Sequence, residues 1–130
     1  MTNRITFPIL AFILLCFVSV KVLADHGEKH KEAYYQQIVC DIHDADVEVR
    51  NEDNTRTDCL SVEESIEVDF APKWYECLGQ AMHYARLNRN KAVCMLVVMN
   101  RKDESRVVSA KMLIDHFHLP VEVQQIWGGV

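Results

Sequence analysis

Hydrophobic and polar residues alternate in several short stretches of the chain, a pattern typical of half-buried strands. The clearest case is residues 65–70 (Ser-Ile-Glu-Val-Asp-Phe), where apolar side chains would face one side of a sheet and polar ones the other. Residues 47–50 alternate in the same way, and residues 55–60 continue in extended form after a polar turn at 51–54. We therefore predict three consecutive strands with short connections.

Other segments repeat apolar residues every three or four positions, as amphipathic helices do. This spacing predicts helices over residues 28–39 and 73–87. A third helix is expected to end at Phe117 and to begin near Asp103 or Ser105, either of which can cap it.

Residues 92–99 form an unbroken apolar run, which indicates a strand covered on both faces. A last strand is predicted over residues 121–126. The predicted order is therefore α-β-β-β-α-β-α-β. Because helical crossovers follow a three-strand meander, at least one strand pair must be parallel. We predict an α/β fold with a mixed central sheet flanked by helices.

The first 24 residues differ in character from the rest. A start with Arg4, an apolar run over residues 5–20 and a small-residue exit ending at Ala24 are typical of an export signal. The run is shorter than the about 20 residues that span a bilayer, which favours cleavage over a retained anchor. We expect a periplasmic or secreted single domain over residues 25–130, with no membrane contact after removal of the signal.

The charge of the expected domain limits its partners. Two of the 14 basic residues, Arg4 and Lys21, and none of the 19 acidic residues lie in the signal, so 12 basic against 19 acidic residues leave a net charge of about −7. This charge excludes a simple polybasic binder of nucleic acid or anionic membrane. The apolar share of 49% and the scarcity of proline and glycine exclude a disordered chain.

Export into an oxidising compartment favours pairing of cysteines. The expected domain holds four of them, which allow three pairings and contain no Cys-x-x-Cys arrangement of the kind found in zinc ribbons. We expect one or two disulfides, with buried free thiols as the alternative, and the pairing stays open. The four are Cys40, Cys59, Cys77 and Cys94.

Acidic residues gather on the hairpin formed by the second and third predicted strands. With Ser61 opposite Ser65, Asp58 falls within one residue of Glu67 across the ladder. Asp69 lies on the same face as Glu67. Carboxylates this close repel, so they require a cation, protonation or open water; a solvated acidic surface is the alternative interpretation. Mg²⁺ or Mn²⁺ suits such oxygen ligands and needs only two carboxylates with water and a substrate phosphate.

The next helix adds further polar groups on one line along its surface. Lys73, Gln80 and Tyr84 lie within about 40° of that line, together with Cys77. Lys73 follows Asp69 by four residues, so its ammonium can reach the carboxylates. The side chains of Gln80 and Tyr84 can hydrogen-bond a phosphate or a base, or edge the packed face of the helix.

These residues together resemble the pattern of the PD-(D/E)xK, or restriction-endonuclease-like, superfamily. The Gln-x-x-x-Tyr element is similar to that of its RecB-type exonuclease branch. The order α-β-β-β-α-β over residues 28–99 resembles the common core of the family. The residues that carry the resemblance are Asp58, Glu67, Asp69, Lys73, Gln80 and Tyr84.

By that resemblance the protein would be a divalent-metal-dependent nuclease. Asp58 and Glu67 would hold Mg²⁺ or Mn²⁺, which polarises a phosphodiester and lowers the pKa of the attacking water. Gln80 and Tyr84 would orient the substrate. Glu32 stands where some members of the family place another acidic residue.

One position departs from the family pattern. The family has a lysine two residues after the glutamate, where this chain has Asp69, so Lys73 would replace that lysine from the first turn of the helix while Asp69 adjusts the site. Without such a replacement, the alternative is an exported non-catalytic binding module on a nuclease-like scaffold. A disulfide-stapled domain with a plain acidic surface is a third interpretation.

Two further considerations bear on function. The acidic net charge opposes binding of nucleic acid unless Arg and Lys cluster at the groove. A cysteine nucleophile, Cys59 or Cys77 with His83 as base, is a further alternative, although His83 points away from the line of Cys77 on the helix. The oligomeric state stays open.

Overall fold

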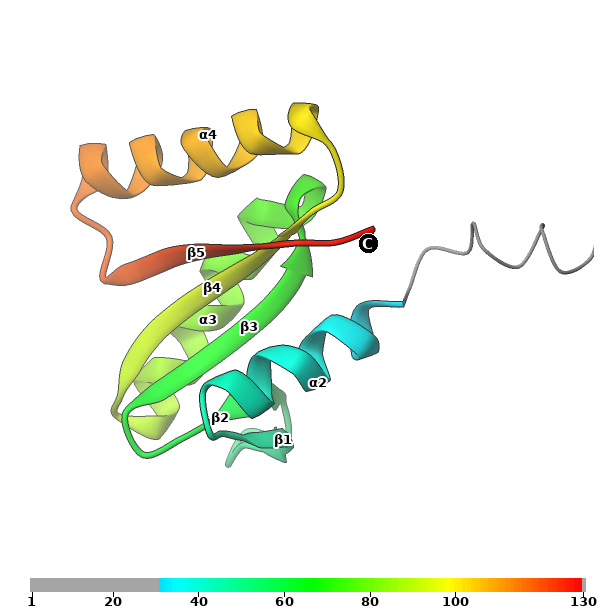
Figure 1. The fold of residues 1–130 in the computed structure, drawn as a ribbon. Helices are drawn as coiled ribbons and strands as arrows, with labels where there is room; N and C mark the ends of the chain where they lie inside the picture. Colours follow the sequence, from blue (N-terminus) through cyan, green and yellow to red (C-terminus); the bar gives the residue numbers. More distant parts are fainter. Residues whose placement is uncertain (1–30, 130) are drawn as a thin grey trace, which may run out of the picture.

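The computed structural model describes residues 31–129, so the predicted export signal lies outside the described residues. The predicted order α-β-β-β-α-β-α-β is confirmed (Figure 1). The elements are α2 (Glu32–Ile42), β1 (Asp46–Arg50), β2 (Arg56–Leu60), β3 (Glu64–Phe70), the 3₁₀ helix η2 (Ala71–Lys73), α3 (Trp74–Asn88), β4 (Lys91–Val98), α4 (Arg101–Phe117) and β5 (Val121–Trp127).

The five strands form one mixed sheet in the order β1-β2-β3-β4-β5. The first three strands are antiparallel neighbours, and β4 and β5 continue parallel to β3, as helical crossovers require. Helices α3 and α4 pack on one face of the sheet and α2 on the other (Figure 1). The chain is therefore an α/β protein whose mixed sheet is flanked by three helices.

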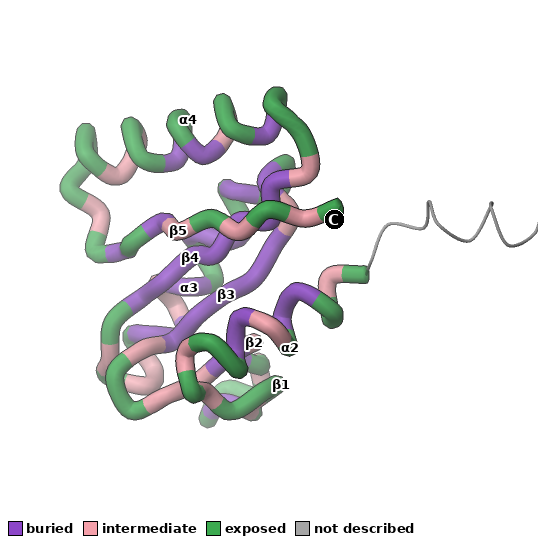
Figure 2. The backbone as a smooth tube through the Cα atoms, viewed as in Figure 1, coloured by how far each residue is buried: buried purple, intermediate pink, exposed green. Residues whose placement is uncertain are grey.

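Strand β4 is the centre of the packing, as its apolar run predicts. Its residues are buried from Ala92 to Val98 and alternate between two cores. Ala92 and every second residue after it contact the α3 and α4 side, whereas Val93 and every second residue after it contact α2. Figure 2 shows the continuous burial of this strand beside β3.

Helix α4 begins earlier than the sequence predicts. Asn100, not Asp103 or Ser105, is its N-cap: the Asn100 side chain accepts a hydrogen bond from the Asp103 amide at 3.1 Å. The Asp103 amide also donates to the Asn100 carbonyl at 3.0 Å, and the buried Asp103 carboxylate reaches back to accept from the Met99 amide at 3.0 Å.

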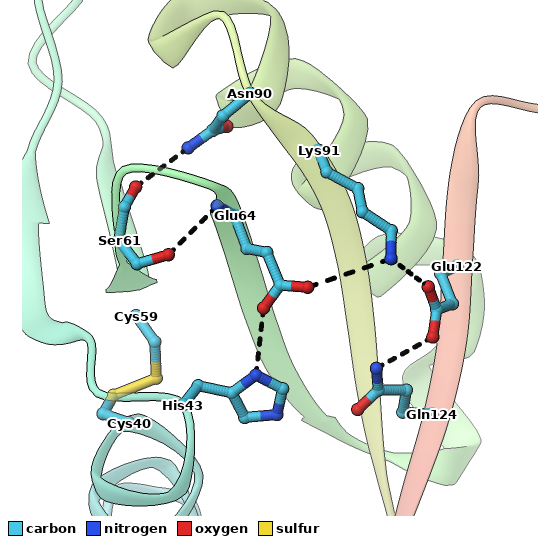
Figure 3. Close-up of polar contacts among 9 residues, drawn as sticks. All are labelled: Cys40, His43, Cys59, Ser61, Glu64, Asn90, Lys91, Glu122 and Gln124. Atoms are coloured by element: carbon cyan, nitrogen blue, oxygen red, sulfur yellow. Dashed lines mark hydrogen bonds and ion pairs between the residues drawn. A yellow bond between two sulfur atoms is a disulfide. The ribbon is translucent and has the colours of Figure 1, made fainter.

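A polar network ties together the starts of the three parallel strands (Figure 3). Glu64 at the start of β3 contacts His43 after α2 at 3.0 Å and Lys91 at the start of β4 at 3.8 Å. Lys91 also pairs with Glu122 of β5, which accepts from Gln124 at 2.9 Å. Because the Lys91 side chain is half exposed, its ion pairs add little to stability.

The four cysteines pair as Cys40–Cys59 and Cys77–Cys94. The first disulfide joins α2 to β2 and the second joins α3 to β4, so both helix layers are linked covalently to the sheet. The free-thiol alternative is wrong, and two disulfides are compatible with an exported protein. Within the described part of the chain, none of the helices has the length and apolar character needed to cross a bilayer.

Candidate functional site

The candidate site lies where β2 and β3 part. Their ladder is short, and β3 continues beyond it without β2 as a neighbour. There the Val68 amide donates to Oδ2 of Asp58 at 2.9 Å, so a side chain replaces the backbone partner of the strand. The paired residues of the ladder are Leu60 with Ser65 and Cys59 with Ile66.

The observed register differs by one residue from the predicted one. Ser61 closes the turn with Glu64 instead of lying opposite Ser65: the Ser61 amide donates to the Glu64 carbonyl at 2.9 Å, and the Glu64 amide donates to Ser61 Oγ at 3.0 Å (Figure 3). Continued along the strands, this register places Asp58 directly opposite Glu67, closer than predicted.

The polar face of β3 is buried under α3, contrary to the predicted half-exposed strand and to the alternative of a solvated acidic surface. Ser65 is satisfied there, since it donates to Asn90 at 2.8 Å and accepts from Asn88 at 3.2 Å. Asp69, which is 4% exposed, is paired with Lys73. Glu67 is 6% exposed, and its Oε2 is the one buried side-chain oxygen or nitrogen within residues 31–129 that lacks a hydrogen-bond partner.

Burial and crowding make Glu67 a weak acid. Burial is the largest cause, and repulsion from Asp58 and Asp69 adds to it, so that the pKa of Glu67 rises to about 9. The carboxyl is therefore protonated at neutral pH unless a cation offsets the cost of its charge.

The two neighbouring acids are shifted in the same direction. Burial raises the pKa of Asp58 to about 6, against the opposing effect of the Val68 amide. Burial, followed by repulsion from Glu32, raises the pKa of Asp69 to about 7, and Lys73 acts against this rise. Three adjacent carboxyl groups thus titrate above their ordinary range.

Lys73 reaches the acidic group from the end of η2. Its Nζ lies 3.5 Å from Asp69 Oδ1 and 3.7 Å from Glu32 Oε2, which raises the pKa of the ammonium. Lys73 and Asp69 are thus brought together as predicted, and Glu32 of α2 joins them. No ion pair in the described part of the chain links Lys73 to Asp58 or Glu67, and about half of the lysine side chain is exposed.

Sequence reasoning missed two residues of this region. Gln36 of α2 is buried, and its Nε2 donates to Glu48 Oε1 at 2.7 Å and to the Asp58 carbonyl at 3.2 Å. Glu48 lies in β1 with a left-handed backbone (φ 55°), a costly conformation for a residue other than glycine. Its charge helps to raise the pKa of both Asp58 and Glu67. Since β1 pairs with β2 in a register that places position 48 opposite Asp58, the same hairpin argument applied one strand earlier would have found Glu48.

The two residues of the Gln-x-x-x-Tyr element lie differently. Tyr84 is buried, and its pKa is raised by burial and by the charges of Glu67 and Asp58, so its hydroxyl lies within electrostatic reach of the acids. Gln80 is exposed one helical turn earlier, and no hydrogen bond among the described residues joins it to the carboxylates.

The alternative of a cysteine nucleophile is wrong, because Cys59 and Cys77 are both in disulfides and carry no thiol. His83 is instead engaged on the surface, where its Nε2 lies 2.7 Å from Asp53 Oδ2.

No protein-family model, curated protein or solved structure matches this chain. The chemistry of the site must therefore be inferred from its own geometry. Within residues 31–129, no three His, Cys, Asp or Glu side chains are placed to enclose a metal ion. Asp58 and Glu67 do offer two hard oxygen donors, one of them buried without a partner, and Mg²⁺ commonly takes one or two carboxylates and fills its other positions with water and phosphate. Both are donors of the chemical type that such a cation takes.

Proposed function

We propose that the protein is a divalent-metal-dependent phosphodiesterase of the nuclease type, in which Asp58 and Glu67 hold the ion. The observation that carries this proposal is the buried Glu67 carboxyl, whose Oε2 has no hydrogen-bond partner among the described residues. The charge of Asp58 acts on it, and the Asp58 carboxylate binds the amide of the next residue, Val68. An unpaired buried oxygen costs free energy, and a bound cation would offset that cost.

The arrangement of elements supports a restriction-endonuclease-like core. The order α-β-β-β-α-β over the first part of the domain places Asp58 on the second strand and Glu67 on the third. Tyr84 lies on the helix that follows, within electrostatic reach of both acids, and Glu32 lies on the first helix. Each of these positions is the one that the sequence resemblance implies.

The residues of the chain would have distinct tasks in hydrolysis. A bound Mg²⁺ or Mn²⁺ would polarise the phosphodiester and lower the pKa of the attacking water. Glu67 would release its proton as the ion binds, because its raised pKa keeps it protonated beforehand. Tyr84 stays protonated, since its pKa is raised, and can donate a hydrogen bond to a phosphate oxygen. The exposed ammonium of Lys73 can neutralise part of the phosphate charge.

One observation favours a second candidate, an exported binding module without catalysis. Asp69 stands at the position where the resemblance requires a lysine, and Lys73 already has two carboxylates, Asp69 and Glu32, to neutralise. A site of this kind would bind a divalent ion and leave a phosphodiester intact.

Metal titration and nuclease assays test both candidates. We expect Mg²⁺ or Mn²⁺ to raise the melting temperature of the wild type. At a hundredfold excess of the ion over Kd, the free energy of unfolding should increase by about 2.7 kcal/mol. Neither ion should stabilise Glu67→Ala. Cleavage of DNA or RNA should fall at least about a hundredfold in the same variant. Glu63→Gln, on the exposed turn after Ser61, is the matched control and should behave as wild type.

The outcomes separate the candidates. Equal background cleavage by wild type and Glu67→Ala would overturn the enzyme. If a divalent ion stabilises the wild type but not Glu67→Ala, and neither protein cleaves nucleic acid, the non-catalytic binding module is the supported candidate. If neither ion stabilises the wild type, both metal-binding candidates are wrong and an acidic structural domain remains.

A further inference from the structure

Each of the two disulfides lies beside one member of the acid pair. Cys59 directly follows Asp58 in β2 and is bonded to Cys40 of α2 (Figure 3). Cys94 is the direct neighbour of Glu67 in the parallel register of β3 and β4, and it is bonded to Cys77 of α3. The two carboxyl-bearing residues are thus each linked, through a neighbouring residue, to a different helix layer.

The sulfur atoms also contact the backbone of the acids themselves. Cys40 Sγ lies 3.4 Å from the Asp58 carbonyl oxygen, and Cys77 Sγ lies 3.6 Å from the Glu67 carbonyl oxygen. A disulfide sulfur carries no hydrogen, so these are packing contacts and not hydrogen bonds. All four cysteines are fully buried, so each of these contacts lies in the protein interior.

Without such restraints the acid pair has a simple way to relax. The β2–β3 ladder ends at Cys59 and Ile66, and beyond this point the Asp58 side chain links β2 to β3 by accepting from the Val68 amide. When both groups are ionised, repulsion between Asp58 and Glu67 adds to the cost of burying them and favours separation of the two strands at this point. A covalent link from each acid's neighbour to a packed helix opposes that separation.

We propose that the two disulfides are positioning elements of the acid pair, Cys40–Cys59 for Asp58 and Cys77–Cys94 for Glu67, so that the site is assembled only in the oxidised protein. This proposal deepens the proposed function and rests on it. Metal binding would then be confined to compartments in which the disulfides form, and a chain that still holds four thiols would carry the residues of the site without its geometry.

The first test removes one disulfide at a time, in Cys40→Ala/Cys59→Ala and in Cys77→Ala/Cys94→Ala. We expect hydrogen-exchange protection of the Val68 amide to fall at least about tenfold in the first variant, relative to the Val97 amide of the central strand. We expect the affinity for Mn²⁺ to fall at least about tenfold in both variants. Val121→Ala, a core truncation in β5 whose register partner in β4 is Ala92, is the control for general destabilisation. It should change neither the relative protection of Val68 nor the affinity for Mn²⁺.

A second test keeps both disulfides and uses the reciprocity of coupled equilibria. Reduction by dithiothreitol delivers two electrons and two protons to a disulfide, giving two cysteine thiols and cyclic oxidised dithiothreitol. Its midpoint is measured at about pH 9.5, where both acids carry charge. In the oxidised wild type, Cys77–Cys94 holds Glu67 near Asp58 against their mutual repulsion. Glu67→Gln removes this repulsion, so the equilibrium constant for reduction of Cys77–Cys94 should fall about tenfold, which corresponds to a reduction potential about 30 mV lower. Asp58→Asn should do the same for Cys40–Cys59, and Glu63→Gln should change neither midpoint.

The results distinguish this proposal from the proposed function. Neither the hydrogen exchange of the Val68 amide nor the reduction midpoints require a metal or a substrate. If both change as predicted but no metal binds, the disulfides still position the acid pair, and only the proposed metal-dependent function is overturned. A folded variant that lacks one disulfide and keeps wild-type Val68 protection and Mn²⁺ affinity would overturn only the positioning role. If both cysteine variants fail to fold, unchanged midpoints in Glu67→Gln and Asp58→Asn would overturn it, and the predicted shifts would support it.

Discussion

A carboxyl group that is buried near two other carboxyl groups keeps its proton to a higher pH than a carboxyl group in water. At the scale of single residues, Glu67 is such a group. Its pKa of about 9 in the folded protein compares with 4.5 for an ordinary glutamate. Between about pH 4.5 and about pH 9, the folded chain keeps a proton on Glu67 that the unfolded chain has lost. Raising the pH across this interval therefore destabilises the fold, by at most about 1.4 kcal/mol per pH unit.

Replacement of Glu67 by glutamine should remove this part of the pH dependence. We expect Glu67→Gln to be more stable than wild type by about 2–4 kcal/mol at pH 8, because the amide is never charged, and to match wild type near pH 4, where the carboxyl is protonated in both states. Urea unfolding at a series of pH values in the absence of divalent ions measures the difference.

The neighbouring acids give this experiment its background and its control. Asp58 and Asp69 also have raised pKa values, of about 6 and about 7, so a weaker loss of stability with rising pH should persist in Glu67→Gln up to about pH 7. Glu63→Gln should follow the wild-type curve. Wild-type and Glu67→Gln curves that run parallel from pH 5 to pH 9 would contradict the buried, protonated state of Glu67.

At the scale of elements, the pattern of apolar and polar residues predicted each α-helix and strand within residues 31–129 but left open what covers each face. The alternation of residues 65–70 correctly separated the two sides of β3, yet alternation describes two faces and not their exposure. Helix α3 covers the side that carries Ser65, Glu67 and Asp69, so a side expected to meet water is buried. The same burial gives the acidic residues their unusual pKa values.

The parts of the site that could be predicted are those set by neighbours in sequence. Asp58 and Glu67 meet because their strands form a hairpin, and Lys73 meets Asp69 because it follows by four residues. Disulfide pairing and the contact of Gln36 depend on which helix lies on which face of the sheet, and no pattern along the chain encodes that choice. A left-handed glutamate such as Glu48 likewise has no signature in residue type.

Two glycines provide a matched test of the element packing. Gly79 lies on the exposed side of α3 with open space where a Cβ would stand, so Gly79→Ala should stabilise the protein by about 0.5–1 kcal/mol. Gly128 follows β5, and a Cβ there would lie 2.5 Å from Met99 Sδ and 2.7 Å from Tyr35 Oη. Gly128→Ala should therefore cost about 1–3 kcal/mol. Urea unfolding measures both, and equal effects of the two substitutions would contradict the docking of the chain end against α2.

At the scale of the whole molecule, charge and proposed substrate are in conflict. The sequence carries a formal net charge of −5, and the proposed site is itself built from carboxyl groups. A nuclease with a basic groove gains affinity as salt is lowered, because phosphate contacts release counterions. In this protein long-range repulsion acts in the opposite direction and is strongest at low salt, where the Debye length is greatest.

The proposed nuclease should accordingly show an inverted salt dependence. At fixed Mg²⁺ or Mn²⁺, we expect kcat/KM for single-stranded DNA to rise several-fold as ionic strength increases from about 0.01 M to about 0.1 M, since the Debye length shortens from about 30 Å to about 10 Å. A small phosphodiester with a single charge is the control, and its kcat/KM should change less than about twofold because weak repulsion leaves little to screen. Steady-state kinetics with both substrates measures the contrast. A kcat/KM for DNA that falls steeply with salt would show that basic side chains such as Lys73 dominate the field at the site, and that the net charge of the domain does not govern encounter with the substrate.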